Sequence, residues 1–129
     1  MENVLGGPLQ ECGLDPVTGF TRSGSCEVTV DDVGVHGICA VMTEDFLDHQ
    51  YWIGNDLLTP RAAWGFPGLR PGDRWCVVAD RWVQAERDLR AAPVVLASTH
   101  VSVLQLVPLS LLQRYAVDVP DDLSGLAQG

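Results

Sequence analysis

Residues 37–47 read GICAVMTEDFL, and this stretch predicts that a buried strand passes directly into a helix. The run from Gly37 to Met42 is apolar and contains β-branched residues, as buried strands do. Thr43 is a good helix N-cap, and the acidic pair that follows suits the positive end of the helix dipole. We therefore expect a strand over 37–42 and a helix that begins after Thr43 and stops near Gly54.

Further strands and helices alternate after this unit. Residues 75–79 and 93–97 predict two more strands, and helices are expected over 81–90, after Ser98 or Thr99 to about residue 106, and over 109–116. A loop over 55–74 contains three prolines and three glycines, and we expect at most a short 3₁₀ turn inside it. Long loops of this kind in compact domains are often functional.

The first 35 residues are dominated by turn signals, and only residues 27–30 alternate like a short strand. The whole pattern predicts an α+β fold of two layers, in which helices cover one face of a small sheet and a long irregular segment precedes it. A small parallel α/β unit is the alternative. We expect a single domain over 1–129, with a loosely held tail over 119–129.

Composition excludes several classes of function. The formal net charge is −9, which argues against a nucleic-acid partner and against an anionic membrane surface. All eight basic residues are arginine, so chemistry that needs a lysine, such as a Schiff base, the usual pyridoxal-phosphate site or a Walker phosphate loop, is excluded. No apolar run is long enough to span a bilayer and no targeting segment is visible, so we expect a cytoplasmic protein.

Four cysteines in a reducing compartment are expected to be thiols rather than disulfides. The gaps between them are 13, 12 and 36 residues, without the close pair that is typical of zinc sites, so we expect no metal and no other cofactor. Cys39 and Cys76 lie in apolar strands and are expected to pack inertly. Cys12 and Cys26 lie in polar loops and are the candidates for a reactive thiol, with Arg22 as the nearby cation.

Several segments together resemble the bacterial domain-of-unknown-function 2237 family. They are 12–20 (CGLDPVTGF), 22–26 (RSGSC), 32–43 (DVGVHGICAVMT), 54–57 (GNDL), 66–76 (FPGLRPGDRWC), 81–82 (RW) and 99–100 (TH). The resemblance runs from about Asn3 to Asp118 and implies a single-domain α+β fold without a known activity. The sequence departs from the family pattern at Val78, where a Cys is frequent, and at Tyr115, where a His is frequent. A mechanism that needs a thiol at position 78 or an imidazole at position 115 therefore has less support in this chain.

Short polar residues beside Gly or Pro in the two irregular segments are the candidates for a site. Their ordinary role is to hold turns together. Alternatively, the segments converge over the edge of the sheet and form a pocket. Candidate ligand-binding residues are Asp15, Thr18, Arg22, His36, Asn55 and Asp56. Candidates for acid–base or thiol chemistry are His36, Asp56, Asp73, His100 and Cys26.

The sequence favours a small polar metabolite-binding protein, or an enzyme without an organic cofactor, whose site is built from the two loop-rich segments. The alternative is an accessory or interaction module, in which Trp52 and Trp64 contact a second copy of the chain or another protein. A metal or redox site on the cysteines is a minor alternative.

Overall fold

The computed structural model describes residues 1–118, and the tail expected over 119–129 lies outside them. Its elements follow one another as β1 (Ile38–Val41), α1 (Glu44–Trp52), η1 (Ala62–Trp64), β2 (Arg74–Val77), α2 (Ala79–Arg87), η2 (Leu96–Ser98), η3 (Val101–Gln105) and α3 (Leu109–Arg114), where η denotes a 3₁₀-helix. None of the helices in residues 1–118 has the length and apolar character that a membrane span requires.

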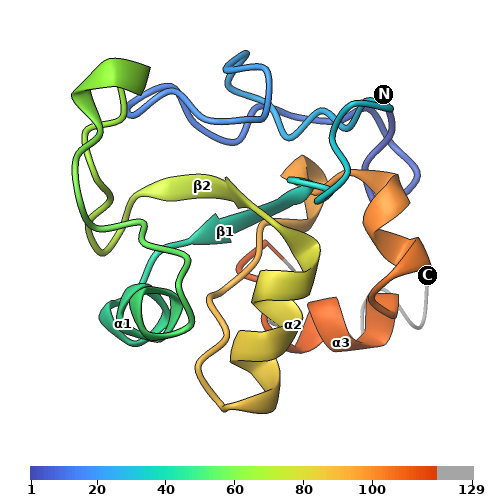
Figure 1. Ribbon diagram of the computed structural model, residues 1–129. Helices are drawn as coiled ribbons and strands as arrows, with labels where there is room; N and C mark the ends of the chain where they lie inside the picture. Colours follow the sequence, from blue (N-terminus) through green and yellow to red (C-terminus); the bar gives the residue numbers. More distant parts are fainter. Residues whose placement is uncertain (119–129) are drawn as a thin grey trace.

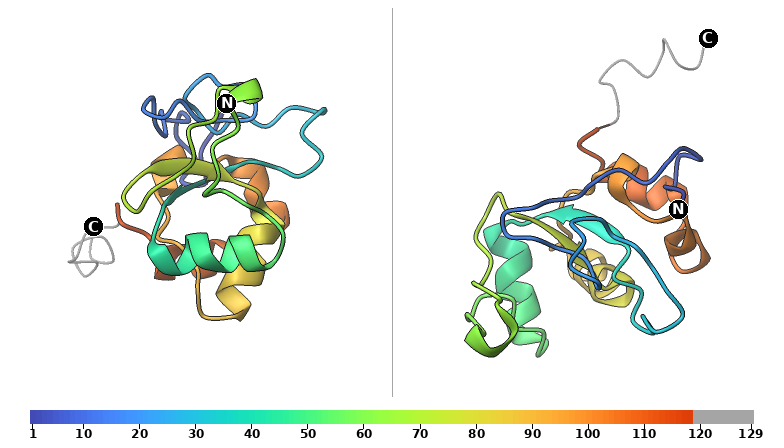
Figure 2. Two further views of the ribbon diagram at one scale, coloured as in Figure 1. Left: turned by 60° about the vertical axis from the view of Figure 1, so that its left-hand side comes forward. Right: turned by 90° about the horizontal axis from the view of Figure 1, so that it is seen from above.

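The two strands form one antiparallel sheet, which has a different partner on each face. Ile38 pairs with Val77 and Cys39 pairs with Cys76, so side chains on the two strands alternate in step between the faces. Figure 1 shows helices α1, α2 and α3 on one side of the sheet and the irregular N-terminal segment on the other, and Figure 2 shows the same arrangement from two further directions. The α+β fold expected from the sequence is confirmed.

The main hydrophobic core lies between the sheet and the helices. Ile38 and Val77 contribute from the strands, Phe46 from α1 and Trp82 from α2, and all four are at most 2% exposed. The indole N–H of Trp82 donates to the backbone oxygen of Ala92 at 2.9 Å, so burying this side chain leaves no polar group unpaired.

The helix starts follow the predictions with small shifts. The hydroxyl of Thr43 accepts the amide hydrogen of Phe46 at 3.1 Å, so Thr43 is the N-cap of α1 as expected. Gly54 follows α1 with a φ of 88°, in the left-handed region that glycine adopts without strain. Helix α2 begins at Ala79, two residues before the expected start; Val78 offers no side-chain cap, and Asp80 lies in the first turn.

Two expected strands are absent from residues 1–118, and one expected helix is of a different kind. The strand over 93–97 is wrong, because only Val94 forms bridges, to Ala40 and to Ala116, before the chain turns into η2. The helix after Thr99 is a 3₁₀-helix with His100 as its N-cap. Residues 27–30 form no strand, since their backbone makes no ladder with either β1 or β2.

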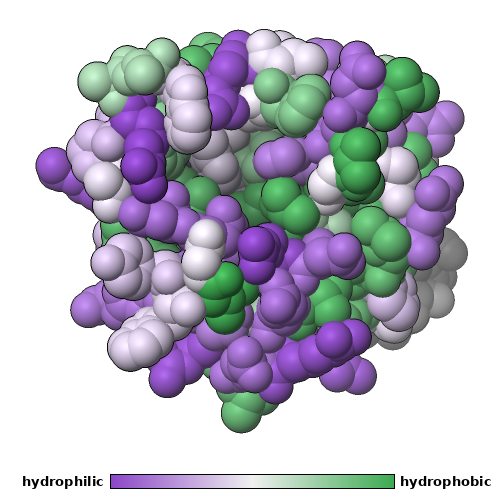
Figure 3. Space-filling model, viewed as in Figure 1, coloured by the Kyte–Doolittle hydropathy of each residue, from purple (hydrophilic) through white to green (hydrophobic). Residues whose placement is uncertain are grey.

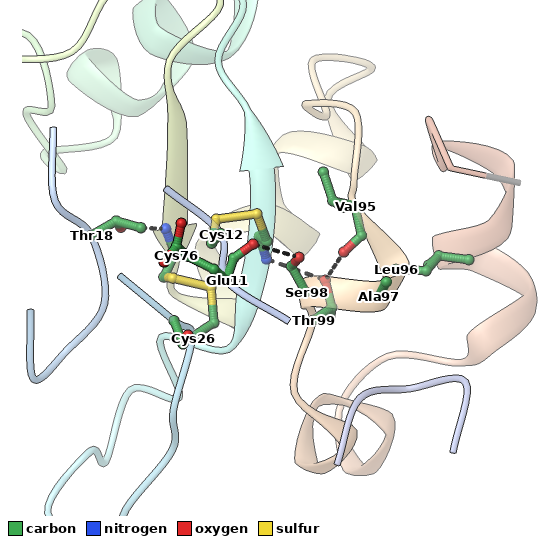
Figure 4. The surroundings of a disulfide bond; sticks show 12 residues. Glu11, Cys12, Thr18, Cys26, Cys76, Val95, Leu96, Ala97, Ser98 and Thr99 are labelled. Carbon is green, nitrogen blue, oxygen red and sulfur yellow. Dashed lines mark hydrogen bonds between the residues drawn. A yellow bond between two sulfur atoms is a disulfide. The ribbon is translucent and has the colours of Figure 1, made fainter. Parts of the chain in front are cut away.

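Two disulfides attach the N-terminal segment to the sheet. Cys12 is bonded to Cys39 of β1, and Cys26 is bonded to Cys76 of β2. Figure 4 shows the two bonds next to one another beside the strands. The expectation of four thiols is wrong for this structure. The physical reason is the register, because Cys39 and Cys76 are direct cross-strand partners and therefore face the same side.

The chain between Cys12 and Cys26 is also tied to the open edge of β2. The buried hydroxyl of Thr18 accepts the amide hydrogen of Cys76 at 2.8 Å (Figure 4). Gly19 then turns with a φ of 104°, where a side chain would collide with the backbone oxygen of Ser25. This loop consequently carries Arg22 to a fixed place beside β2.

We expect Gly37→Ala to lower the free energy of unfolding by about 1–3 kcal/mol, because the added methyl overpacks the core. An ideal Cβ at Gly37 would lie 2.8 Å from Cγ2 of Val103 and 3.1 Å from Cγ2 of Val28. The matched control is Gly7→Ala, where the nearest atom lies 3.7 Å away in the Asn3 side chain. Urea unfolding followed by tryptophan fluorescence measures both variants, and equal stability of the two would contradict this packing.

Candidate functional site

A pocket of about 450 Å³ lies among the N-terminal segment, the loop after α1 and β2. Arg22, His36, Asn55 and Asp56 all line it, although they come from both irregular segments. Its remaining side chains include Arg61 and the aromatic residues Trp64, Phe66 and Trp75. In the orientation of Figure 1, the space-filling view shows a hollow in the upper part of this face, with both hydrophilic and hydrophobic side chains around it (Figure 3).

Arg22 is held in place without a carboxylate partner. Its guanidinium lies 4.8 Å from the centre of the Trp75 ring, and Nη1 donates to the backbone oxygen of Gly19 at 2.7 Å. No carboxylate within residues 1–118 lies within 4.0 Å of this guanidinium. The remaining donors of Arg22 are therefore available to an anion, and a guanidinium can bind a carboxylate or phosphate through two parallel hydrogen bonds.

His36 is oriented by a buried carboxylate. Nδ1 of His36 lies 2.6 Å from Oδ1 of Asp32, while the other oxygen of Asp32 accepts the backbone N–H of His36 at 2.8 Å. The Asp32 side chain has no exposed surface, whereas 33% of the His36 side chain is exposed. Because a carboxylate accepts from Nδ1–H, the pairing leaves Nε2 as the acceptor nitrogen. The Phe20 ring, with its centre 5.4 Å from the imidazole, limits rotation of His36 further.

Asp56 is engaged in holding its own turn. One of its oxygens accepts the amide hydrogens of Leu58 and Thr59 at 2.9 and 3.0 Å, and the other lies 3.6 Å from Arg61. Hydrogen bonds from Thr59, with its side chain first, lower the pKa of Asp56 below its usual value. The carboxyl therefore stays ionised and does not fit the role of a proton donor near neutral pH. Its contribution to the pocket is to position Arg61.

Asn55 is anchored through a buried amide. Nδ2 of Asn55 donates to Oε1 of Gln50 at 2.8 Å, and Gln50, fully buried on α1, in turn donates to the backbone oxygen of Arg81 at 3.3 Å. Oδ1 of Asn55 accepts no hydrogen bond from residues 1–118. The side chain therefore presents an acceptor to the pocket from a fixed position.

A second hollow, of about 410 Å³, lies against the first. It shares Arg22, Trp64, Phe66 and Trp75 with the first pocket and adds residues 14–17, including Asp15. Arg22 and Trp75 therefore line both spaces. Asp15 lines only the second hollow, whereas His36 and Asn55 line only the first pocket of the two.

The other candidate residues lie outside both hollows. Thr18 is buried at the edge of β2, and Asp73 accepts the amide hydrogen of Arg70 at 2.8 Å in a surface turn. His100 caps η3, where its Nδ1 accepts the amide hydrogen of Ser102 at 3.0 Å. The expectation of a reactive thiol at Cys26 is wrong for this structure, since its sulfur is bonded to Cys76.

Two residues of the site were missed by the sequence analysis. Asp32 stands among the turn signals of the first 35 residues, although its spacing of four residues from His36 is a usable signal. Arg61 was not singled out at all, and only its place inside the long loop indicated it.

The two exposed tryptophans do not share a pocket. Trp64, which is 75% exposed, borders the two hollows described above. Trp52, which is 84% exposed, lies with His49 and Asp88 at a separate hollow of about 420 Å³. In Figure 1 and in the left view of Figure 2, the segment around η1 lies above the sheet and α1 lies below it, and the two tryptophans on these elements line different hollows.

The fold defines a small α+β protein whose irregular segment is attached to a two-stranded sheet by disulfides. A family model matches residues 2–116, and its description is "uncharacterized protein conserved in bacteria". The chain belongs to this family, DUF2237, as its motifs indicate. A search of curated proteins finds no match.

We expect Asp32→Asn to invert the tautomer of His36. The amide nitrogen of Asn donates a hydrogen bond, so Nδ1 would become the acceptor and the proton would move to Nε2. Two-dimensional ¹H–¹⁵N NMR of the imidazole ring reports which nitrogen carries the proton. Asp31→Asn, which changes the exposed neighbouring carboxylate, is the control and should leave the tautomer unchanged. An unchanged His36 spectrum in folded Asp32→Asn would contradict the assignment.

We expect the protein to lose stability as the pH falls below about 6.5, in part through His100. Burial lowers the pKa of His100 below its usual value, and the positive charge of the chain's amino terminus acts in the same direction. Because the folded-state pKa lies below the unfolded one, protonation favours unfolding, and the loss begins at the unfolded pKa. His100→Asn keeps a capping acceptor without a titrating ring, so urea unfolding at pH 7.5 and 5.5 should show a smaller difference for this variant.

Proposed function

We propose that the protein binds a small anionic metabolite that has a flat apolar portion, and that His36 exchanges a proton with it. A single observation supports this function best. The same pocket is lined by an arginine that has no carboxylate partner among residues 1–118 and by a histidine that a buried carboxylate orients. Anion recognition and proton transfer commonly need these two groups together.

The charge and shape of the pocket support an anion as its ligand. The chain carries a formal net charge of −9, yet this pocket is lined by Arg22 and Arg61 against a single carboxylate, that of Asp56. Trp64, Phe66 and Trp75 add aromatic surface to the same space. Ligand pockets typically combine apolar walls with a few fixed polar groups, and the volume of about 450 Å³ suits a metabolite rather than a peptide.

The His36–Asp32 pair supports a chemical step as well as binding. A general base needs a fixed ring and a free acceptor nitrogen, and the carboxylate on Nδ1 supplies both. The other candidate bases have weaker support, because Asp56 is engaged in its turn and Asp73 and His100 lie outside the pocket. An enzyme that uses the site would therefore depend on His36.

An interaction module is the second candidate, in which Trp52 or Trp64, each largely exposed at its own hollow, supplies an aromatic contact to a partner. Native mass spectrometry separates the two functions, since a retained small molecule supports the first and a dimer or a co-purified protein supports the second. The expected location of either is the cytoplasm.

We expect the disulfide-intact protein to bind phenyl phosphate or benzoate, and Arg22→Gln to weaken that binding by about 10-fold or more. Glutamine keeps the stem of the side chain and a terminal N–H donor but lacks the guanidinium, so it removes the charge and the two parallel donors at Arg22. Arg70→Gln is the matched control, because Arg70 is exposed and lies outside the pocket. Isothermal titration calorimetry measures all three proteins. If neither probe binds, or if Arg22→Gln binds as well as the control, the proposed function fails.

A further inference from the structure

All four cysteines of the chain meet at one buried place. Cys12 and Cys26 come from the N-terminal segment, and Cys39 and Cys76 come from β1 and β2 (Figure 4). Each is at most 3% exposed. The sulfur atoms of Cys12, Cys26 and Cys39 all lie within 4.8 Å of one another, and the fourth sulfur is bonded to that of Cys26.

We propose that the reduced form of this cluster is a four-thiolate zinc site, formed by Cys12, Cys26, Cys39 and Cys76. The site is separate from the pocket of Arg22 and His36, and it does not depend on the function proposed for that pocket.

The positions of the sulfurs fit the coordination that zinc prefers. Zinc binds four thiolates tetrahedrally with Zn–S bonds of about 2.3 Å, which places the sulfurs roughly 3.8 Å apart. The sulfurs of Cys12, Cys26 and Cys39 already lie within 4.8 Å of one another, and the bonded pairs Cys12–Cys39 and Cys26–Cys76 must move apart toward the tetrahedral separation once each S–S bond opens. Val41 and Val95 pack against the cluster, and a closed site that excludes water is typical of structural zinc.

The backbone around the cluster is held by hydrogen bonds that do not involve sulfur. Cys12 donates to the backbone oxygen of Gly24 at 2.8 Å, and Cys76 donates to the hydroxyl of Thr18 at 2.8 Å. The amide hydrogen of Cys39 is accepted by the hydroxyl of Thr99 at 3.2 Å (Figure 4). These contacts can keep the four cysteines together after the disulfides open, which is the preorganisation that metal binding needs.

The two states are related by a balanced reaction. In a reducing compartment, a dithiol reductant transfers two electrons and two protons to each protein disulfide and becomes a disulfide itself. The four protein thiols then bind one Zn²⁺ as thiolates and release four protons. Both the disulfide-bonded form and the zinc-bound form attach the N-terminal segment to both strands. The disulfides therefore hold the fold in an oxidising environment, and zinc holds it in a reducing one.

The test begins with protein reduced by a phosphine under anaerobic conditions and then freed of reductant and metal. We expect it to take up one Co²⁺ per chain, with the visible absorption of tetrahedral cobalt and the ultraviolet band of thiolate-to-cobalt charge transfer. Zn²⁺ should displace the cobalt at the same stoichiometry. Where reduction unfolds the chain, zinc should restore the far-ultraviolet circular dichroism, because metal binding supplies folding free energy.

Two controls separate this site from other metal binding. The disulfide-intact protein should take up no cobalt with thiolate bands, and Cys26→Ser should lose the four-thiolate spectrum after reduction. The proposal is overturned if the reduced protein binds no metal, if zinc fails to refold an unfolded reduced chain, or if Cys26→Ser gives the wild-type spectrum. None of these outcomes depends on a ligand in the pocket, so the two proposals fail independently.

Discussion

The attachment of an irregular segment to a two-stranded sheet is the constraint on which the rest of this structure depends. Two strands alone are only marginally stable, so both faces of β1 and β2 must be covered. Helices cover one face through a large apolar core, whereas the N-terminal segment has no regular structure to cover the other. The two disulfides provide the stabilisation that buried apolar area does not provide on this face. They span 27 and 50 residues and therefore reduce the conformational entropy of the unfolded chain substantially.

The sequence predicted correctly those secondary-structure elements that depend mainly on residues close by in the chain. The strand before Thr43, the N-cap of α1 and the 3₁₀ turn in the long loop depend on neighbouring residues, and the structure contains all three. The strand over 93–97 failed because its apolar residues are buried without a continuous ladder. The cysteines were misjudged because their proximity follows from the register of Cys39 and Cys76, which spacing along the chain does not reveal.

In the candidate site too, the sequence indicated some features, and others depend on contacts that only the fold creates. Short polar residues next to Gly and Pro drew attention to Arg22, His36, Asn55 and Asp56, and the structure gathers these four around one space. Their individual roles could not be read from the sequence, because a carboxylate that anchors its own turn, such as Asp56, and a guanidinium with no carboxylate partner in residues 1–118, such as Arg22, look alike there. Asp32 was missed because its contact with His36 requires the turn at Val35, which has a φ of 57°.

Arg22 lies on the stretch of chain whose two ends are Cys12 and Cys26, and its guanidinium rests on Trp75, the strand neighbour of Cys76. A loop that disulfides fix at both ends loses little conformational entropy when a ligand binds, whereas the same loop without its disulfides must be ordered on binding. The coupling is reciprocal, so a ligand bound to Arg22 would make the two disulfides harder to reduce. The factor by which the ligand shifts the reduction equilibrium equals the factor by which the disulfides raise the affinity for the ligand.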